Sequence, residues 1–207
     1  AIFRSNINTL NSKKPSWRAY GQNKKLPLLI ALIFSSMVYA NTNKPFLEGV
    51  NDVVQLNFEN GDKYEGQIEF CIIRNKKANC MQGIGIYSIQ NSHYYQGSFN
   101  NNKPHGYGLF SHENGQSYEG GFKEGRIEGK GIMNYPDGRQ YKGNFKNNNR
   151  NGYGVMIYPE GRIYGEGSRY EGEWKRNKRD GRGVMIYIDD ERRLEGLFKE
   201  NIYIKGL

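Results

Sequence analysis

Histidine, cysteine and tryptophan are scarce in this chain of 207 residues, which holds three, two and two of them. The histidines fall at no spacing typical of metal ligands, so we expect no metal site. No Ser/His/Asp or Cys/His arrangement stands out. The recurring Gly-x-Gly pairs open strand-like segments and not helices, which argues against a nucleotide loop. The sequence therefore predicts a protein without a cofactor and without enzymatic activity.

Acidic residues are absent from the first 40 positions, which contain six basic residues. The last of these positions form an uncharged run of 15 residues, 26–40, that ends in Val-Tyr-Ala. A basic flank, a short apolar core and such an ending are typical of a bacterial secretory signal. An uncleaved anchor and a buried helix are the alternatives, although a membrane span needs about 20 residues. We therefore expect an exported protein, periplasmic or extracellular, or membrane-anchored if the leader is retained.

Most of the positive charge belongs to this leader. The whole chain has a net charge of +9, whereas residues 41–207 hold 24 basic and 21 acidic residues, a net of +3. Overall charge therefore gives no reason to expect nucleic-acid binding. One basic cluster remains, with Glu171, Glu173 and Asp180 in the same unit, and it is either a solvated turn or a contact for an anionic surface. Its members are Lys175, Arg176, Lys178, Arg179 and Arg182.

A period of 23 residues organises the rest of the chain. Gly-x-Gly pairs begin at residues 83, 106, 129, 152 and 181, and the first four are each 23 residues apart. A second marker, Tyr-x-Gly-x-Phe/Trp or a near variant, starts at Tyr64, Tyr95, Tyr118, Tyr141, Tyr170 and, with leucine, Leu194. Such a period is the signature of a repeat architecture in which each unit packs against its neighbours.

Each unit has the pattern of a β-hairpin. Residues 118–123 alternate so that Tyr118, Gly120 and Phe122 share one face, and residues 152–158 alternate in the same way. The turns between the arms are rich in Asn and Gly, which tolerate positive φ. The sequence therefore predicts an all-β fold: an elongated, twisted, single antiparallel sheet of repeated hairpins, about twelve short strands, preceded by a signal or anchor helix.

Glycine recurs between the aromatic residues of these strands, although glycine weakens a strand. Because it lacks a Cβ, it leaves a recess in which a ring of a neighbouring strand can lie flat, so we predict a ladder of rings as the core. The alternative is an exposed aromatic stripe that stacks on sugars or lipids. The predicted repeat core consists of Tyr95, Phe99, Tyr118, Phe122, Tyr141, Phe145, Tyr170, Trp174, Gly106, Gly108, Gly129, Gly131, Gly152, Gly154, Gly181 and Gly183.

The two cysteines, Cys71 and Cys80, lie in the first unit, which carries an insert of eight residues. Residues 67–73 and 81–87 read as the two arms of one hairpin. In an oxidising compartment the pair would form a disulfide that closes the enlarged turn. Two free buried thiols and a metal site are the alternatives.

The unit resembles the MORN (membrane occupation and recognition nexus) repeat, whose consensus joins Tyr-Glu-Gly-x-Phe/Trp-Lys to Gly-x-Gly and Tyr-Pro-Asp/Glu-Gly. Residues 118–140 and 141–163 match best, and the resemblance covers about residues 48–207. The insert after Tyr64, six extra residues around 164–169 and Leu194 in place of tyrosine depart from it. The resemblance implies an elongated, twisted antiparallel sheet and a scaffold or adaptor role, with acidic phospholipid or a second copy as partners of some members.

Three segments follow from these patterns: the leader, 1–40; a linker with an N-terminal capping strand, 41–63; and the repeat domain, 64–207. Its units start near residues 64, 95, 118, 141, 170 and 194. We expect residues 50–58 to cap the first unit, and residues 202–204 to close the last. The predicted core face of the capping strand holds Asp52, Val54, Leu56 and Phe58. No second domain is expected.

These expectations favour a non-enzymatic scaffold that binds an envelope protein whose identity the sequence does not give. Oligomers through edge strands fit the same fold. The alternative is adhesion to anionic phospholipid or a cell-surface glycan through exposed aromatics and the basic turn residues.

Overall fold

The computed structural model describes residues 45–73, 75–90, 92–159, 168–187 and 192–206. Within these ranges the fold is all-β, with thirteen strands and a short 3₁₀ helix, Pro45–Leu47. The predicted leader, 1–40, lies outside the described residues, and so does most of the six-residue insert. Among the described residues, no helix has the length and apolarity to cross a membrane.

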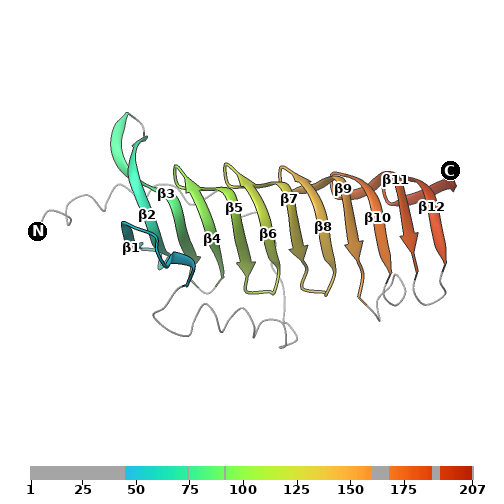
Figure 1. Cartoon of the computed structure of the whole chain (residues 1–207), viewed down its shortest axis with the longest axis horizontal. Helices are drawn as coiled ribbons and strands as arrows, with labels where there is room; N and C mark the ends of the chain where they lie inside the picture. The colour runs from blue at the N-terminus through green and yellow to red at the C-terminus, as the bar shows by residue number, and fades with distance from the viewer. Residues whose placement is uncertain (1–44, 74, 91, 160–167, 188–191, 207) are drawn as a thin grey trace, which may run out of the picture. The chain divides into compact units, whose positions relative to one another are not determined.

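The strands are antiparallel and their order in the sheet follows the sequence from β1 to β13 (Figure 1). Short connections between sequence neighbours produce this order, as the two turn signals in each unit predict. The hairpin-repeat fold is therefore confirmed. The strands are β1 (Val53–Asn57), β2 (Lys63–Ile73), β3 (Lys76–Ile89), β4 (His93–Asn100), β5 (Lys103–His112), β6 (Ser117–Lys123), β7 (Arg126–Asn134), β8 (Gln140–Lys146), β9 (Asn149–Ile157), β10 (Arg169–Lys175), β11 (Lys178–Ile186), β12 (Arg193–Lys199) and β13 (Ile202–Gly206).

Contacts divide the described residues into two compact units, one within residues 1–115 with 123–125, and one within residues 116–122 with 126–207. In the first unit Tyr95 lies opposite Tyr87 on one side and Phe110 on the other. In the second unit Tyr141 lies opposite Met133 and Met156. Because directly opposed residues share a face, each unit has one face of tyrosine, phenylalanine and methionine. We call it the tyrosine face.

Two-residue turns connect the first and second arms. Both residues of each turn have positive φ, as type I′ turns require. Asn and Gly adopt this conformation at low cost, which accounts for their recurrence at the second position. The five turns are Asn101-Asn102, Glu124-Gly125, Asn147-Asn148, Arg176-Asn177 and Glu200-Asn201.

The first glycine of each Gly-x-Gly pair does not take the core position that we predicted. These glycines have positive φ and are exposed or half-buried. They lie near a shift in hairpin register, such as that between Gly143 and Phe145. A bulge with a positive-φ residue favours glycine, so backbone conformation, and not ring packing, explains Gly106, Gly129, Gly152 and Gly181.

The capping strand is shorter than predicted. Leu56 of β1 lies opposite Tyr64 of β2, and Val54, Leu56 and Phe58 are half-buried. Asp52 was wrongly assigned to the core face: it precedes β1, has a φ of 59° and is exposed. At the other end of the chain, β13 contains the expected closing strand.

Candidate interaction surfaces

The first-arm tyrosine rings lie directly on glycine backbone. A Cβ added to Gly108 would lie 2.5 Å from Cε2 of Tyr95, and Tyr118, Tyr141 and Tyr170 cover Gly131, Gly154 and Gly183 in the same way. Each ring is fixed at its far end as well: the Tyr95 hydroxyl donates to the carbonyl of Ser98 at 2.9 Å. A side chain at the second glycine would displace the ring, so packing requires glycine there.

Edge-to-face contacts link successive rings into a ladder within each unit. In the second unit Tyr141 meets Phe145 at 5.1 Å and Trp174 at 5.3 Å between ring centroids, both near perpendicular. This geometry is the favourable one for aromatic pairs. All eight predicted core rings are buried, so the tyrosine face does not offer them to a ligand; they are Tyr95, Phe99, Tyr118, Phe122, Tyr141, Phe145, Tyr170 and Trp174. Burial also raises the pKa of Tyr170 to about 12.

Two arginines complete this packing, a role that the sequence analysis missed. The Arg150 guanidinium carbon lies 4.5 Å from the Trp174 ring centroid, and that of Arg179 lies 5.6 Å from both Tyr170 and Phe198. Each guanidinium also donates to a turn carbonyl, Arg179 to Asn201 at 2.8 Å. Both residues follow a hairpin turn by two positions. Arg179 was grouped with the basic turn residues by its charge, and Arg150 was not singled out.

The predicted basic cluster is divided by these contacts. Arg179 is committed to the aromatic ladder, and Lys178 forms an ion pair with Glu200 at 3.2 Å. The Lys175, Arg176 and Arg182 residues are exposed. Asp180 lies in the same region and pairs with Lys199 at 3.3 Å. The cluster therefore mixes acidic and basic groups and is weaker as an anion-binding surface than its sequence suggests.

The opposite face of the second unit carries a row in which aliphatic and charged residues alternate. Directly opposed pairs connect β7 to β12 one residue per strand, through Ile132, Lys142, Val155, Glu171, Val184 and Glu195. Second arms supply the aliphatic residues and first arms the charged ones. We call this the mixed face; its alternation follows from the 23-residue period.

An exposed apolar strip crosses the mixed face on β9. Tyr153 and Ile157 are 53% and 45% exposed, with Val155 between them on the same face. The Tyr153 hydroxyl donates to Glu171 at 2.7 Å, and Arg169 also bonds to this carboxylate. Those hydrogen bonds, that from Tyr153 first, lower the pKa of Glu171, and the same bond raises the pKa of Tyr153. This hydrogen bond fixes the Tyr153 hydroxyl beside Glu171 on the surface.

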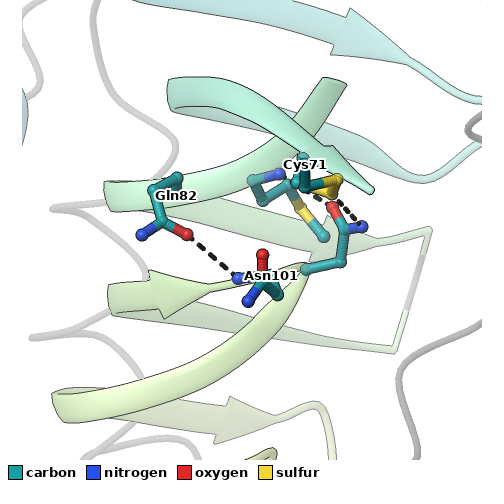
Figure 2. The surroundings of a disulfide bond; sticks show 6 residues. Cys71, Gln82 and Asn101 are labelled. Carbon is teal, nitrogen blue, oxygen red and sulfur yellow. Dashed lines mark hydrogen bonds between the residues drawn. A yellow bond between two sulfur atoms is a disulfide. The ribbon is translucent and has the colours of Figure 1, made fainter. Parts of the chain in front are cut away.

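Cys71 and Cys80 form a disulfide across β2 and β3, with their Cα atoms 5.9 Å apart. Figure 2 shows the bond beside the β4–β5 turn, where the Asn101 N–H donates to the Gln82 side chain at 3.0 Å. Asn102 donates to Sγ of Cys80 at 3.1 Å. We call residues 68–81 the stapled hairpin, because the disulfide joins its two arms and the hydrogen bonds connect it to the β4–β5 turn.

A clustering of metal-ligating side chains is not found in the described ranges: no three His, Cys, Asp or Glu residues could hold a metal ion.

Comparison with known proteins bears on the repeat. A model of the MORN repeat matches residues 95–117, 118–138, 141–161 and 170–192. The chain contains four MORN repeats. MORN repeats are of a non-enzymatic scaffold type and commonly mediate protein or membrane interactions. The stapled hairpin lies outside the four matched stretches.

Other comparisons are less informative. The search of curated proteins finds no match. Among solved structures, the chain is similar to the SAS-4 (dCPAP) TCP domain in complex with a proline-rich motif of Ana2 (dSTIL), from Drosophila melanogaster. The identity is 13%, the match covers 70% of this chain and 90% of that one, and the TM-score is 0.33.

Proposed function

We propose that this protein is a non-enzymatic scaffold that binds another protein through the mixed face of its MORN repeats, in the cell envelope. The observation that carries the proposal is the exposed strip Tyr153, Val155 and Ile157 with Glu171 beside it. Tyrosine and aliphatic residues next to an ionic rim are typical of the centre of protein interfaces. The tyrosine face does not compete for this role, because its rings are buried.

Site-specific photo-crosslinking tests the proposal in the full chain. A benzoylphenylalanine at position 157 should give a discrete covalent adduct in cells, and the same residue at the exposed turn position Lys175 should not. Tyr153→Ala should weaken the adduct at 157 by at least about fivefold, since truncation of an interface tyrosine costs more than about 1 kcal/mol. Equal adducts at both positions, or none at 157, would refute a partner on this face.

Location in the envelope is a separate part of the proposal. It draws its support from the basic and apolar character of residues 1–40 and from the disulfide, since disulfides persist in oxidising compartments. Expressed in a bacterium, the chain should be recovered from the periplasm or the medium without its leader, or from membranes if the leader is kept. Recovery of the intact chain from the cytoplasm would contradict export.

Adhesion through the basic cluster is the weaker candidate, because Lys178 and Arg179 already have partners within the protein. Neutralising Lys175, Arg176 and Arg182 together should leave the crosslink at 157 intact. Loss of that crosslink in the triple variant would favour adhesion over the scaffold.

A further inference from the structure

The stapled hairpin projects beyond the paired part of the sheet. β1 pairs with β2 up to Gln67, and β4 pairs with β3 from Gly83 on. Residues 68–73 and 76–81 pair with each other, and Figure 1 shows this hairpin extending past the β4–β5 turn. Six residues at about 3.3 Å each give a ribbon of roughly 20 Å.

One face of this ribbon exposes large apolar side chains. Phe70 and Ile72 are 82% and 75% exposed, more than the other exposed large hydrophobic residues of the described chain. They share a face because they are two positions apart along β2, and they lie opposite Asn79 and Lys77. The disulfide lies on the other face, with Ala78 opposite Cys71. Neither Phe70 nor Ile72 belongs to the buried repeat core, so the exposure of these two side chains needs another explanation.

The charge of the hairpin is one-sided. Among the charged side chains that the structure describes in this hairpin, Lys77 lies on the exposed face, whereas the acid Glu69 lies opposite Cys80 on the face of the disulfide. Lys77 lies directly opposite Ile72 and is exposed. Exposed apolar side chains beside a basic residue, with no acid on the same face, are complementary to an anionic bilayer, in which the acyl boundary takes the apolar groups and the headgroups take the charge.

We propose that the stapled hairpin is a lipid-contacting finger, which lays Phe70 and Ile72 into the interface of an anionic membrane with Lys77 at the headgroups. The disulfide and the bonds to the β4–β5 turn order the ribbon in advance, so binding does not have to pay for that order. The residues of this site belong to the first unit, whereas the mixed face belongs to the second.

Tryptophan fluorescence with full-length protein tests the proposal at the finger itself. In Phe70→Trp, vesicles of phosphatidylglycerol and phosphatidylcholine should shift the emission to the blue, and brominated acyl chains should quench it. Because the apolar run 26–40 also favours membranes, the readout is taken at position 70. The matched control is Ile202→Trp on β13, an exposed position (66%) outside the finger, whose emission should not change.

Affinity gives the second arm of the test. Phe70→Ser with Ile72→Ser should lower binding to anionic vesicles at least tenfold, as should 0.5 M salt, whereas Ile202→Ser with Ile204→Ser should not. Since all four side chains are exposed, both variants should keep the fold and the disulfide, which circular dichroism and thiol alkylation check. Bound vesicles that leave the F70W fluorescence unquenched overturn the proposal. So does equal binding to phosphatidylcholine alone, and so does a crosslink from position 70 to a protein with no response to lipid. The crosslink at position 157 is unaffected by any of these outcomes.

Discussion

The regular hairpins of the second unit and the extended β2–β3 hairpin of the first are held together in different ways. In β8–β9, with arms of 7 and 9 residues, Tyr141 lies on Gly154 and joins its ring to two others. In β2–β3, with arms of 11 and 14 residues, Tyr64 holds the base on Gly85 in the same manner. Beyond the base a disulfide replaces the ring. A ring buries itself to stabilise a hairpin, whereas this disulfide lies on one face and leaves the side chains of the other face exposed.

The largest effect should come from breaking the ring contact. In Gly154→Ala the new Cβ would overlap the Tyr141 ring, and moving that ring disturbs two edge-to-face pairs. We expect the free energy of unfolding to fall by about 3 kcal/mol, measured by denaturant titration.

Gly129→Asn is the control for that substitution. Gly129 has a φ of +84° and no atom within 4 Å of an added Cβ, and Asn tolerates this conformation. We expect a loss below about 1 kcal/mol. Equal losses in both variants would mean that ring packing is not what distinguishes the two glycines of a pair.

Loss of the disulfide should have the next largest effect. Cys71→Ala with Cys80→Ala removes a closure of eight intervening residues, for which chain entropy gives about 2–3 kcal/mol. Hydrogen exchange should speed up in residues 68–81 while β7 to β12 keep their protection. Mass spectrometry of unreduced native protein should find neither thiol open to alkylation. Two free thiols, or a variant that loses protection throughout, would contradict the local role.

Asparagine side chains in the turns should each contribute about 1 kcal/mol. Asn148 accepts a bond from the Ile127 N–H at 2.8 Å, and its own N–H donates to the Ile127 carbonyl at 3.0 Å. Asn148→Gly keeps the turn conformation and removes the first bond, so we expect a loss near 1 kcal/mol in denaturant titration.

The turn Glu124-Gly125 offers the reverse experiment. There the position of Ile127 is taken by Pro104, which has no N–H, and the position of Asn148 by Gly125, whose N–H donates to the Pro104 carbonyl at 2.9 Å. Gly125→Asn should therefore add no stability by itself, and should add about 1 kcal/mol when combined with Pro104→Ile. A gain from Gly125→Asn alone would show that the missing donor is not the reason for the glycine.

The smallest effect concerns pH. Burial, then the stacked His112 at 5.5 Å, lowers the pKa of His93 to about 4, although Asp62 opposes this shift. A lowered folded-state value means that the unfolded chain takes up the proton first, so stability is full above about pH 6.5 and falls as pH drops toward 4. Because His93 is only half-buried, we expect below about 1 kcal/mol. His93→Gln should make the free energy of unfolding depend less on pH in this range. An unchanged slope would mean that carboxylates cause the pH dependence.

Sequence patterns predicted most of the repeat structure but less about the surfaces. Alternation and the 23-residue period predicted the hairpins, the turns and the eight core rings, because strand geometry places every second residue on one face. Glycine is ambiguous in such a pattern, because Gly152 and Gly154 look equivalent. Gly152 is favoured by a positive φ, whereas Gly154 is required by the close contact of a tyrosine ring. Sequence spacing does not separate these two reasons.

Charge was the less reliable guide. Arg150 and Arg179 lie on aromatic rings. Their guanidinium groups are held there by the carbonyl of a neighbouring hairpin turn, and charge in the sequence does not reveal the position of that carbonyl. The exposure of Phe70 and Ile72 was also not evident, because apolar residues in a strand usually predict burial. A signal was present in the insert length: arms longer than their neighbours must extend beyond the strands that would cover them.

The paired bonds of the turn asparagines have a consequence for how the protein unfolds. Each joins one hairpin turn to the strand that follows the preceding turn, so the hairpins behave as a line of elements coupled to nearest neighbours. Asn102, Asn148, Asn177 and Asn201 each supply two such bonds, and Gly125 supplies one. Cooperativity along a line is limited by its weakest coupling. Under mechanical pulling or partial denaturation, the Pro104–Gly125 junction is where a partly unfolded chain should first stop.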